Sequence, residues 1–369
     1  MEKLLPNICR VQYGFAFDSA KFSDSEGIPL VRIRDVVRGF SETYTTEECN
    51  TEYIVNDGDM LIGMDGEFNI AQWKGGKAYL NQRVCKLIPS DEVDALYLYY
   101  FMPKALKAIE DKTPFVTVKH LSAKELNKIV VPLPTMEEQR RIAVSLRKVD
   151  ELIALRKEQL TKLDGLVKSR FIELFGDTPD GEKVAMADIC RIITDGTHQP
   201  PKFVSEGIPF LFVSNIVTNE IRYDTQKFIS EETYAELIKR TPIAIGDILL
   251  STVGSYGHPA VVKTEKPFCF QRHIAYLKPN ADIVDSEYLR GAILSADVQR
   301  QIDEGVKGIA QKTLNLSEIR KIRLPLPPIE LQKQFAAFVE QTDKSKKVIQ
   351  QSLDKLELLK KALMQEYFG

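Results

Sequence analysis

The chain has 369 residues, and its 50 Lys and Arg residues nearly balance its 52 Asp and Glu residues, which leaves a net charge of −2. A hydrophobic fraction of 44% with 28% charged residues excludes a disordered or fibrous protein, and the length predicts two or three domains. The balanced charge excludes a protein that holds a polyanion by bulk positive charge, so any nucleic acid must be bound by local patches. The five cysteines are scattered without CxxC spacing, which argues against disulfides or zinc and fits a reducing cytoplasm.

Residues 1–134 are predicted to form a mixed α+β domain. Short β-rich runs such as residues 28–37 lie between Gly, Asp and Asn turns, and a helical pattern covers residues 94–110. The domain ends at the sequence VPLP of residues 131–134. Because proline is tolerated at the start of a helix but not inside it, this segment marks the beginning of a helix.

Residues 135–179 are predicted to form one long helix. Glycine and proline nearly vanish there, and Thr135 with Glu138 gives a capping box. Apolar residues recur every seven positions from Leu146 to Leu174. Such a seam requires a helical partner.

Residues 180–369 repeat this organisation. The sequence EGIP occurs at residues 26–29 and again at 206–209. Leu121 aligns with Leu314, and from there the two copies align without a gap to the end of the chain. The second copy predicts a mixed domain over residues 180–327, with a β-rich run at 208–217 and a helical pattern at 286–303, followed by a second long helix over 328–369.

Two long helices with the same apolar seam are expected to pack antiparallel, with the two homologous globular domains at opposite ends and an internal pseudo-twofold axis. At about 1.5 Å per residue, each helix would be roughly 50–60 Å long, which is too long for one small domain to cover. A seam that only stabilises the fold or forms a dimer is the alternative interpretation.

The sequence contains no catalytic motif of the common kinds. It lacks the phosphate-binding loop GxxxxGK[ST], the GxSxG elbow, the HExxH zinc motif and the [DNS]PP[YF] tetrapeptide. The four histidines, His120, His198, His258 and His273, are not spaced as metal ligands and are interpreted as structural or surface residues. We therefore expect no catalytic residue, no metal and no cofactor in this chain.

The order of these features resembles the DNA specificity subunit of type I restriction-modification systems. The resemblance covers the whole chain. It is carried by Val131, Pro132, Leu133 and Pro134 with Glu137, Glu138 and Gln139, by Leu324, Pro325, Leu326 and Pro327 with Glu330 and Gln332, and by Phe175-Gly176 and Phe368-Gly369. One departure is Leu331, which stands where the first copy has Glu138, and it affects only the helix cap.

The resemblance implies a non-catalytic reader of double-stranded DNA. Each globular domain would be a target-recognition domain for one half of a bipartite target, and the helices would set the spacer between the halves. The helices would also dock two methyltransferase subunits and, through the complex, restriction and translocase subunits. The methyl donor would bind the methyltransferase, and no membrane is involved.

Two other functions are compatible with parts of this pattern. A stand-alone nuclease or methyltransferase is disfavoured because its catalytic motifs are missing. A coiled-coil scaffold with two ligand-binding domains and no DNA role is the remaining alternative, and a steep salt dependence of DNA affinity in the assembled complex would argue against it.

Arginine, Asn, Gln, Ser and Thr are the side chains that favour base contacts. Arg32 and Arg34 are expected to alternate along a strand, with Asp35 next to them. The matching segment of the second copy holds Ser214 and Asn215, a replacement that two domains reading different half-sites should show. A solvated strand face is the alternative.

Two Gly-rich turns, at residues 63–69 and 254–259, match in position, and small residues there would let a loop approach a DNA groove. Tyr256 and His258 on the second turn are candidate contacts, with a plain hairpin turn as the alternative. Four lysines are candidate phosphate contacts, although lone lysines often serve only solubility: Lys74, Lys77, Lys307 and Lys312.

Gln82 and Arg83 match Gln271 and Arg272 in the sequence alignment of the two copies. Because both copies share the pair, these residues are poor candidates for telling one base from another. They are expected to serve a common role, either as phosphate contacts or as a buried arginine that fixes the fold.

Overall fold

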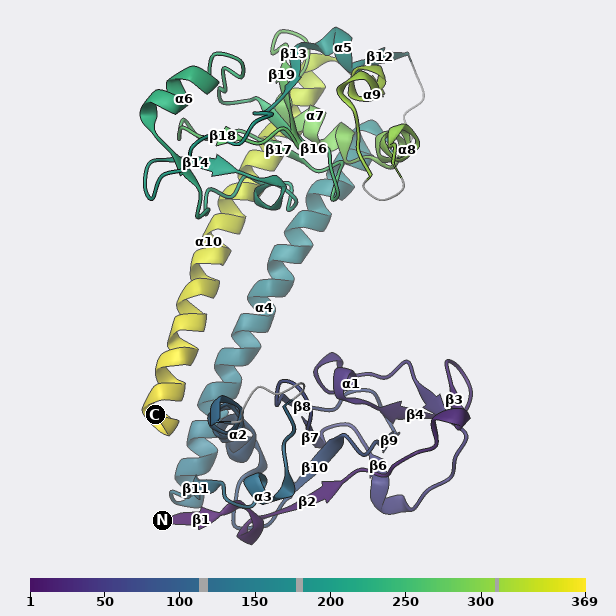
Figure 1. Cartoon of the computed structure of the whole chain (residues 1–369), viewed down its shortest axis with the longest axis vertical. Helices are drawn as coiled ribbons and strands as arrows, with labels where there is room; N and C mark the ends of the chain where they lie inside the picture. The colour runs from purple at the N-terminus through teal and green to yellow at the C-terminus, as the bar shows by residue number, and fades with distance from the viewer. Residues whose placement is uncertain (113–118, 177–181, 309–311) are drawn as a thin grey trace. The chain divides into compact units, whose positions relative to one another are not determined.

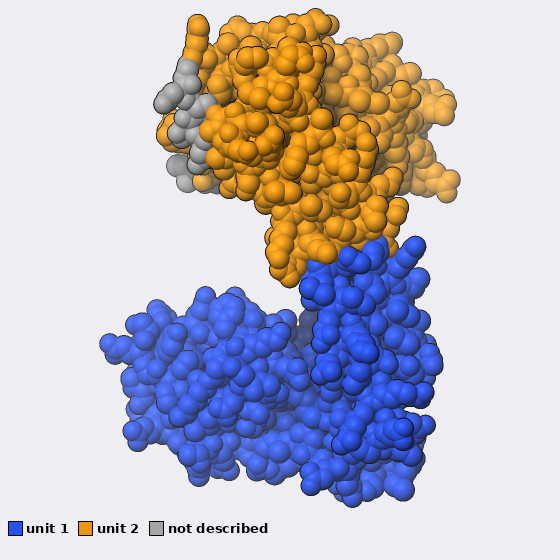
Figure 2. All heavy atoms as spheres, turned by 180° about the vertical axis from the view of Figure 1, so that it is seen from behind, with its two compact units in different colours: residues 1–157, 352–369 blue, residues 158–351 orange. Residues whose placement is uncertain are grey.

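The computed structural model describes residues 1–112, 119–176, 182–308 and 312–369 (Figure 1). It divides into unit 1, with Met1–Lys157 and Ser352–Gly369, and unit 2, with Glu158–Gln351 (Figure 2). The long helices α4 (Met136–Phe175) and α10 (Ile329–Phe368) each contribute residues to both units. The expected domain boundary between residues 179 and 180 lies outside the described residues.

The mixed domain of unit 1 contains a four-stranded antiparallel sheet, a five-stranded sheet and a two-stranded ribbon. Its elements are β1 (Glu2–Leu4), β2 (Cys9–Tyr13), β3 (Phe22–Ser23), β4 (Ile28–Val31), α1 (Ile33–Arg38), β5 (Tyr44–Thr45), β6 (Ile54–Val55), β7 (Met60–Gly63), β8 (Ile70–Gln72), β9 (Ala78–Leu80), β10 (Val84–Pro89), α2 (Ala95–Lys112), α3 (Ala123–Leu126) and β11 (Val130–Pro132). The sheets have the orders β2-β10-β7-β8, β3-β5-β4-β9-β6 and β1-β11.

The mixed domain of unit 2 repeats this plan with a three-stranded second sheet. Its elements are β12 (Lys183–Ala185), α5 (Met186–Ile189), β13 (Cys190–Asp195), β14 (Ile208–Leu211), η4 (Val213–Asn215), β15 (Phe228–Ile229), α6 (Glu231–Leu237), β16 (Ile248–Ser251), β17 (Pro259–Val261), β18 (Cys269–Phe270), β19 (Ile274–Pro279), α7 (Ser286–Ile293), α8 (Ala296–Gly305), α9 (Leu316–Lys321) and β20 (Arg323–Pro325). The sheets have the orders β13-β19-β16-β17, β15-β14-β18 and β12-β20.

Inner strands of the four-stranded sheets anchor each core. All four residues of β7 and all four of β16 are buried, as expected of short apolar strands covered on both faces. In unit 1 the core continues from this sheet through α2 to Leu146 of α4 and Phe368 of α10. In unit 2 it continues through α7 to Phe171 of α4 and Phe335 of α10. Helix segments and domain therefore share one core within each unit.

The β-rich run predicted over residues 28–37 is only partly a strand. Strand β4 ends at Val31, and α1 begins two residues later. The Asp35 carboxylate accepts the backbone N–H of Arg32 at 2.9 Å, and this side-chain bond favours a helical turn over extension. The run at 208–217 ends in the same way, because Asn215 Oδ1 accepts the backbone N–H of Phe212 at 2.9 Å.

The helical pattern predicted over residues 94–110 is confirmed by α2. The pattern over residues 286–303 is helical but interrupted, because it forms the separate helices α7 and α8. Ser295 causes the break. Its hydroxyl donates to the carbonyl of Ala292 at 2.7 Å and caps α8 by accepting the N–H of Val298.

Both long helices are confirmed, and each has 40 residues. The predicted capping box of α4 is present, because Glu138 accepts the Thr135 N–H at 3.1 Å and Thr135 Oγ1 accepts the Glu138 N–H at 3.3 Å. Within unit 1, Asp150 pairs with Lys360 at 2.7 Å and Lys157 with Glu357 at 3.1 Å. The residue numbers rise along α4 as they fall along α10, so the two segments are antiparallel there.

The same direction holds within unit 2. Asp164 forms an ion pair with Lys346, and the rings of Phe171 and Phe335 lie 5.4 Å apart. Phe175, near the end of the first copy, packs against Tyr288 of the second domain at 4.8 Å. Within unit 1, Phe368 packs on Tyr97 at 5.4 Å. The end of each helix therefore completes the core of the other copy's domain.

A buried glutamine ties each long helix to the domain before it. Gln139 Oε1 accepts the backbone N–H of Asp94 at 2.9 Å, and its Nε2 donates to the Pro134 carbonyl at 3.1 Å. Gln332 makes the same bonds at 2.8 Å, from the N–H of Asp285 and to the Pro327 carbonyl. Both glutamines are at least 98% buried. These signature glutamines therefore fix the junction between helix and domain.

We expect Gln332→Leu to lower the free energy of unfolding of unit 2 by about 2 kcal/mol, because the Asp285 N–H and the Pro327 carbonyl lose their buried partner. Urea unfolding monitored by fluorescence or circular dichroism measures this loss. Gln334→Leu is the matched control, since Gln334 is exposed on the same helix and its replacement should change stability by less than about 0.5 kcal/mol. Equal effects of the two substitutions would show that the junction does not depend on Gln332.

Candidate nucleic-acid interface

A tight turn follows a parallel strand pair in each domain. In unit 1, β4 and β9 are parallel, and the turn of residues 81–83 leads from β9 into β10. In unit 2, β14 and β18 are parallel, and the turn of residues 271–273 leads from β18 into β19. We call these the 81–83 turn and the 271–273 turn. Each turn lies just beyond the carboxyl ends of the paired strands.

The hydrogen bonds of the two turns fix which residues are equivalent. Asn81 bridges to Phe15 and its carbonyl accepts the Val84 N–H at 2.9 Å. Gln271 bridges to Thr197, and its carbonyl accepts the N–H of Ile274 at 3.1 Å. Asn81 is therefore the structural counterpart of Gln271.

This register corrects the sequence alignment by one residue. Gln82 corresponds to Arg272, and Arg83 corresponds to His273, because the backbone bonds rather than the matching letters set the turn. The expected buried arginine is also wrong, since Arg83 and Arg272 are exposed. The two turns read Asn-Gln-Arg and Gln-Arg-His, so they differ at every position, and the reason for excluding them from base discrimination no longer applies.

Two further segments meet the turn in each domain. In unit 1 the Met64 N–H donates to the Arg83 carbonyl at 3.0 Å, and the Gly66 N–H donates to the Lys119 carbonyl at 2.9 Å. The Gly-rich turn of residues 63–69 thus lies between the 81–83 turn and the segment before α3.

Unit 2 repeats this arrangement. The Thr252 N–H donates to the His273 carbonyl at 3.0 Å, and the Gly254 N–H donates to the Lys312 carbonyl at 3.1 Å. The candidates Lys307 and Lys312 are exposed there, and Lys307 bridges to Thr313. The structure thus brings together, in each domain, the Gly-rich turn and the tight turn that the sequence singled out separately.

Arg32 and Arg34 lie at the start of α1 rather than on a strand. Both are exposed, and Arg34 donates to Thr43 Oγ1 at 3.1 Å. Arg32 directly follows β4, and the neighbouring Asn81 N–H donates to the Val31 carbonyl at 3.3 Å. Arg32 therefore lies beside the 81–83 turn.

Asp35 and Asn215 are buried and serve the fold, which corrects their interpretation as base contacts. The side chain of Asp35, on the first turn of α1, is fully buried. Asn215 Nδ2 donates to the carbonyls of Arg222 and Asp224 at 3.0 and 2.9 Å. Ser214 beside it remains exposed and stays a candidate.

The other candidates fall into two groups. Tyr256 is half-buried and donates to Asp303 Oδ1 at 2.9 Å, and His258 contacts Asn219 Oδ1 at 3.2 Å, so both have partners within the domain. Lys74 and Lys77 are exposed on the loop between β8 and β9. Lys74 lies next to Gly39, at the opposite end of α1 from Arg32.

Ion pairs lie beside the two tight turns, and the sequence pattern did not predict them. In unit 1 the Asp65 carboxylate contacts Arg83 Nε at 3.5 Å and His120 Nδ1 at 2.5 Å. In unit 2 the Asp195 carboxylate contacts Arg240 Nη2 at 2.5 Å and His198 Nε2 at 2.9 Å.

These unit 2 groups lie next to the 271–273 turn, because the Arg272 N–H donates to the Thr197 carbonyl at 3.0 Å. At the turn itself, burial and the neighbouring Arg272 lower the pKa of His273, which favours its neutral form.

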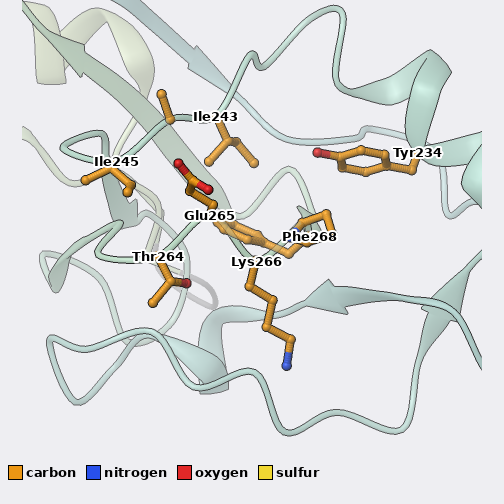
Figure 3. Close-up of a pocket in the computed structure, with 9 residues that line it drawn as sticks. Tyr234, Ile243, Ile245, Thr264, Glu265, Lys266 and Phe268 are labelled. Atoms are coloured by element: carbon orange, nitrogen blue, oxygen red, sulfur yellow. The ribbon is translucent and has the colours of Figure 1, made fainter.

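A cavity of about 440 Å³ lies on unit 2, lined by Tyr234, Ile243, Ala244, Ile245, Thr264, Glu265, Lys266, Pro267 and Phe268 (Figure 3). Glu265 is the one carboxylate among its described lining residues, and Lys266 Nζ lies 4.9 Å from the centre of the Tyr223 ring. Across the described ranges, no group of three His, Cys, Asp or Glu side chains is placed to hold a metal ion. No helix in the described part of the chain is long and apolar enough to cross a membrane.

Comparison with known proteins identifies the family to which this chain belongs. The family described as type I restriction modification DNA specificity domain matches residues 2–164 and again residues 180–358. The two matches cover most of the chain, and each spans one mixed domain with part of a long helix. The chain belongs to this family of DNA specificity proteins.

Two relatives are similar over nearly the whole chain. The specificity subunit of the type I restriction enzyme EcoBI from Escherichia coli is 30% identical, over 99% of this chain and 84% of that protein. The MjaVIII specificity subunit from Methanocaldococcus jannaschii is 24% identical, over 91% of this chain and 87% of that protein.

Solved structures agree on the fold. The type I S subunit from M. genitalium matches with a TM-score of 0.63 and 15% identity, over 100% of this chain and 96% of that one. A chain from a structure of type I restriction-modification complex assembly matches with a TM-score of 0.55 and 19% identity, over 100% of this chain and 97% of that one.

We expect Asn215→Ala to lower the stability of unit 2 by about 2 kcal/mol, because the Phe212 N–H and two carbonyls lose a buried partner. The adjacent exposed Ser214→Ala should leave stability within about 0.5 kcal/mol of the parent. Thermal unfolding of the two variants measures the difference. If Asn215→Ala kept full stability and changed the DNA sequence chosen, Asn215 would be a base contact after all.

Proposed function

We propose that this chain is the DNA sequence-specificity subunit of a type I restriction-modification complex and that each mixed domain reads one half of a bipartite DNA target. The observation that carries the proposal is the pair of equivalent surfaces. Each domain presents a tight turn, a Gly-rich turn and a third segment in the same backbone arrangement. Their side chains differ, as two readers of different half-sites require.

The proposed DNA contacts are the exposed candidates of the two domains, of which Lys74 and Lys77 lie on the loop between β8 and β9, away from the 81–83 turn. They are Arg32, Arg34, Lys74, Lys77, Gln82, Arg83, Ser214, Arg272, Lys307 and Lys312. Tyr256 and His258 are weaker candidates because they already have partners within the domain. Asp35 and Asn215 are not among the proposed contacts because both are buried.

The proposed role of the helices is to hold the two domains apart. Within each unit, the segments of α4 and α10 pack antiparallel and share the core of the domain. A single antiparallel pair running through both units would place the domains at its two ends, related by a pseudo-twofold axis. The spacing between half-sites would then follow from the length of the pair.

Catalysis is assigned to partner subunits. In this proposal two methyltransferase subunits dock on the helices, carry the methyl donor and recruit the restriction and translocase subunits. Exposed leucines on the helix segments of unit 1, Leu152, Leu155, Leu358 and Leu359, offer apolar surface for such docking. The net charge of −2 fits this division, because partners would supply much of the contact with phosphates.

The alternative of a scaffold with two ligand-binding domains and no DNA role has no support among the relatives, which are specificity subunits.

Affinity purification of the full chain from its native cell should recover a methyltransferase, and methylation sequencing of the genome should show one bipartite motif. Exchanging residues 1–134 for the equivalent domain of a relative with another target should change one half of that motif and leave the other intact. The absence of a methyltransferase from the purified complex, or of any bipartite motif, would contradict the proposal.

The ruler role of the helices predicts that a longer pair gives a longer spacer. Seven residues inserted after Lys157 and seven after Gln351 keep the heptad seam and lengthen the pair by about 10 Å, or roughly three base pairs. Methylation sequencing should then report the same half-sites with a spacer longer by about that amount. Replacing seven exposed residues without changing the length is the control, and an unchanged spacer in the lengthened variant would refute the ruler role.

A further inference from the structure

We propose that Arg83 reads a guanine in the half-site of the first domain and that Asp65 holds its guanidinium in position. This rests on the proposed function in DNA recognition and adds to it one residue and one base. The inference depends on the corrected register of the 81–83 turn, which makes Arg83 a feature of the first domain alone.

The backbone at Arg83 is held from two sides. Its carbonyl accepts the Met64 N–H at 3.0 Å, and its own N–H faces Asn81 Oδ1 at 3.5 Å. The turn closes one residue later, where the Val84 N–H donates to the Asn81 carbonyl at 2.9 Å. From this fixed backbone the Arg83 side chain emerges with 53% of its surface exposed.

The contact with Asp65 leaves the reading end of the arginine available. Asp65 Oδ2 lies 3.5 Å from Arg83 Nε, and Oδ1 lies 2.5 Å from His120 Nδ1. No residue in the described part of the chain pairs with the two terminal nitrogens of Arg83. These nitrogens form the fork that donates two hydrogen bonds to O6 and N7 of guanine in the major groove.

The Asp65 carboxylate does not present a bare negative charge to DNA. Its side chain is only 20% exposed, and it is shared between Arg83 and His120. Nearby, Lys119 pairs with Glu110 at 3.5 Å, and the exposed Arg32 lies beside the same turn. Glu67 of the same Gly-rich turn is also exposed, so the positive and negative side chains around Arg83 balance and Arg83 does not sit in a net negative patch.

The second domain has a different residue in place of each of Asp65, His120 and Arg83. The backbone bridge of Asp65 to His120 corresponds to the bridge of Val253 to Thr313, and Arg83 corresponds to His273. The buried Gln139 and Gln332 are the same residue in both copies and share two equivalent hydrogen bonds. Asp35 and Asn215 differ between the copies but are buried, whereas Arg83 is exposed. A group that differs between two otherwise duplicated domains is expected of a determinant of sequence choice.

The test uses the full chain in complex with the methyltransferase that it co-purifies with, and it reads the methylated motif by sequencing host DNA. The parent complex should show a guanine at one position of the first half-site. Arg83→Ala and Arg83→Lys should both relax that position by about 10- to 100-fold in selectivity and leave the second half-site unchanged. Lysine keeps the charge but lacks the fork, so it should not rescue selectivity.

Asp65→Asn tests the positioning role. It should relax the same base position as Arg83→Ala, to a smaller extent, because the guanidinium loses its fixed partner while its donors remain. A purely structural loss would instead lower methylation at all sites without changing the motif. Arg10→Ala is the matched control, since Arg10 is an exposed arginine of the same sheet system on β2, and it should leave motif and rate unchanged.

The outcomes separate this inference from the function it rests on. A parent complex that yields no bipartite motif contradicts the proposed function itself. If the parent complex shows a bipartite motif and Arg83→Lys keeps full selectivity at the guanine position, Arg83 contacts a phosphate rather than the base. This result overturns the inference. The inference about Arg83 is also overturned if Arg83→Ala lowers methylation equally at all sites although the variant has the same melting temperature as the parent and still binds the methyltransferase.

Discussion

The junction between each mixed domain and its long helix is the constraint on which the rest of the structure depends. A buried glutamine in the first turn of the helix accepts the N–H of an aspartate that itself caps the domain helix, Asp94 for α2 and Asp285 for α7. In the same place a tyrosine hydroxyl donates to a proline carbonyl of the PLP segment, from Tyr97 to Pro132 and from Tyr288 to Pro325. Because these groups are buried and paired, rotating a domain about its helix would leave several polar groups without partners. The junction thus fixes the orientation of each mixed domain, and of its proposed DNA-contact surface, relative to the adjoining helix segment.

A division of labour between duplicated and differing residues follows from this. The glutamine, the aspartate, the tyrosine and the terminal phenylalanine of each helix make the same contacts in both units. The residues at the tight turns differ at each equivalent position, although their backbone bonds match. A fixed frame that carries replaceable side chains allows sequence choice to change without disturbing the core, because the core clusters contain none of these exposed side chains.

Much of the architecture could be predicted because its signals are local. Apolar periodicity and proline placement indicated both long helices, and repeated letters indicated the duplication. The end of β4 at Val31 could not be predicted from residue type, because a single side-chain bond from Asp35 to the Arg32 backbone decides it. The pairing of Asp65 with Arg83 also lay beyond the sequence, since the register of β7 against β10 brings the two turns together. The sequence alignment of the 271–273 turn with the 81–83 turn was wrong by one residue for the same reason. It matched identical residue types, whereas backbone hydrogen bonds set the structural equivalence.

The ion pairs beside the two turns contribute to the near-neutral charge of the chain. In each ion pair a carboxylate holds an arginine in place and cancels its charge: Asp65 holds Arg83, and Asp195 holds Arg240. A held side chain loses less conformational entropy when it meets a base than a free one does, which favours selectivity. The cancelled charge at the same time weakens long-range attraction to phosphates, which dominates affinity for any DNA. Under the proposed function, a reader of this kind would discriminate well but bind DNA weakly by itself, so we expect a partner subunit to contribute positive surface.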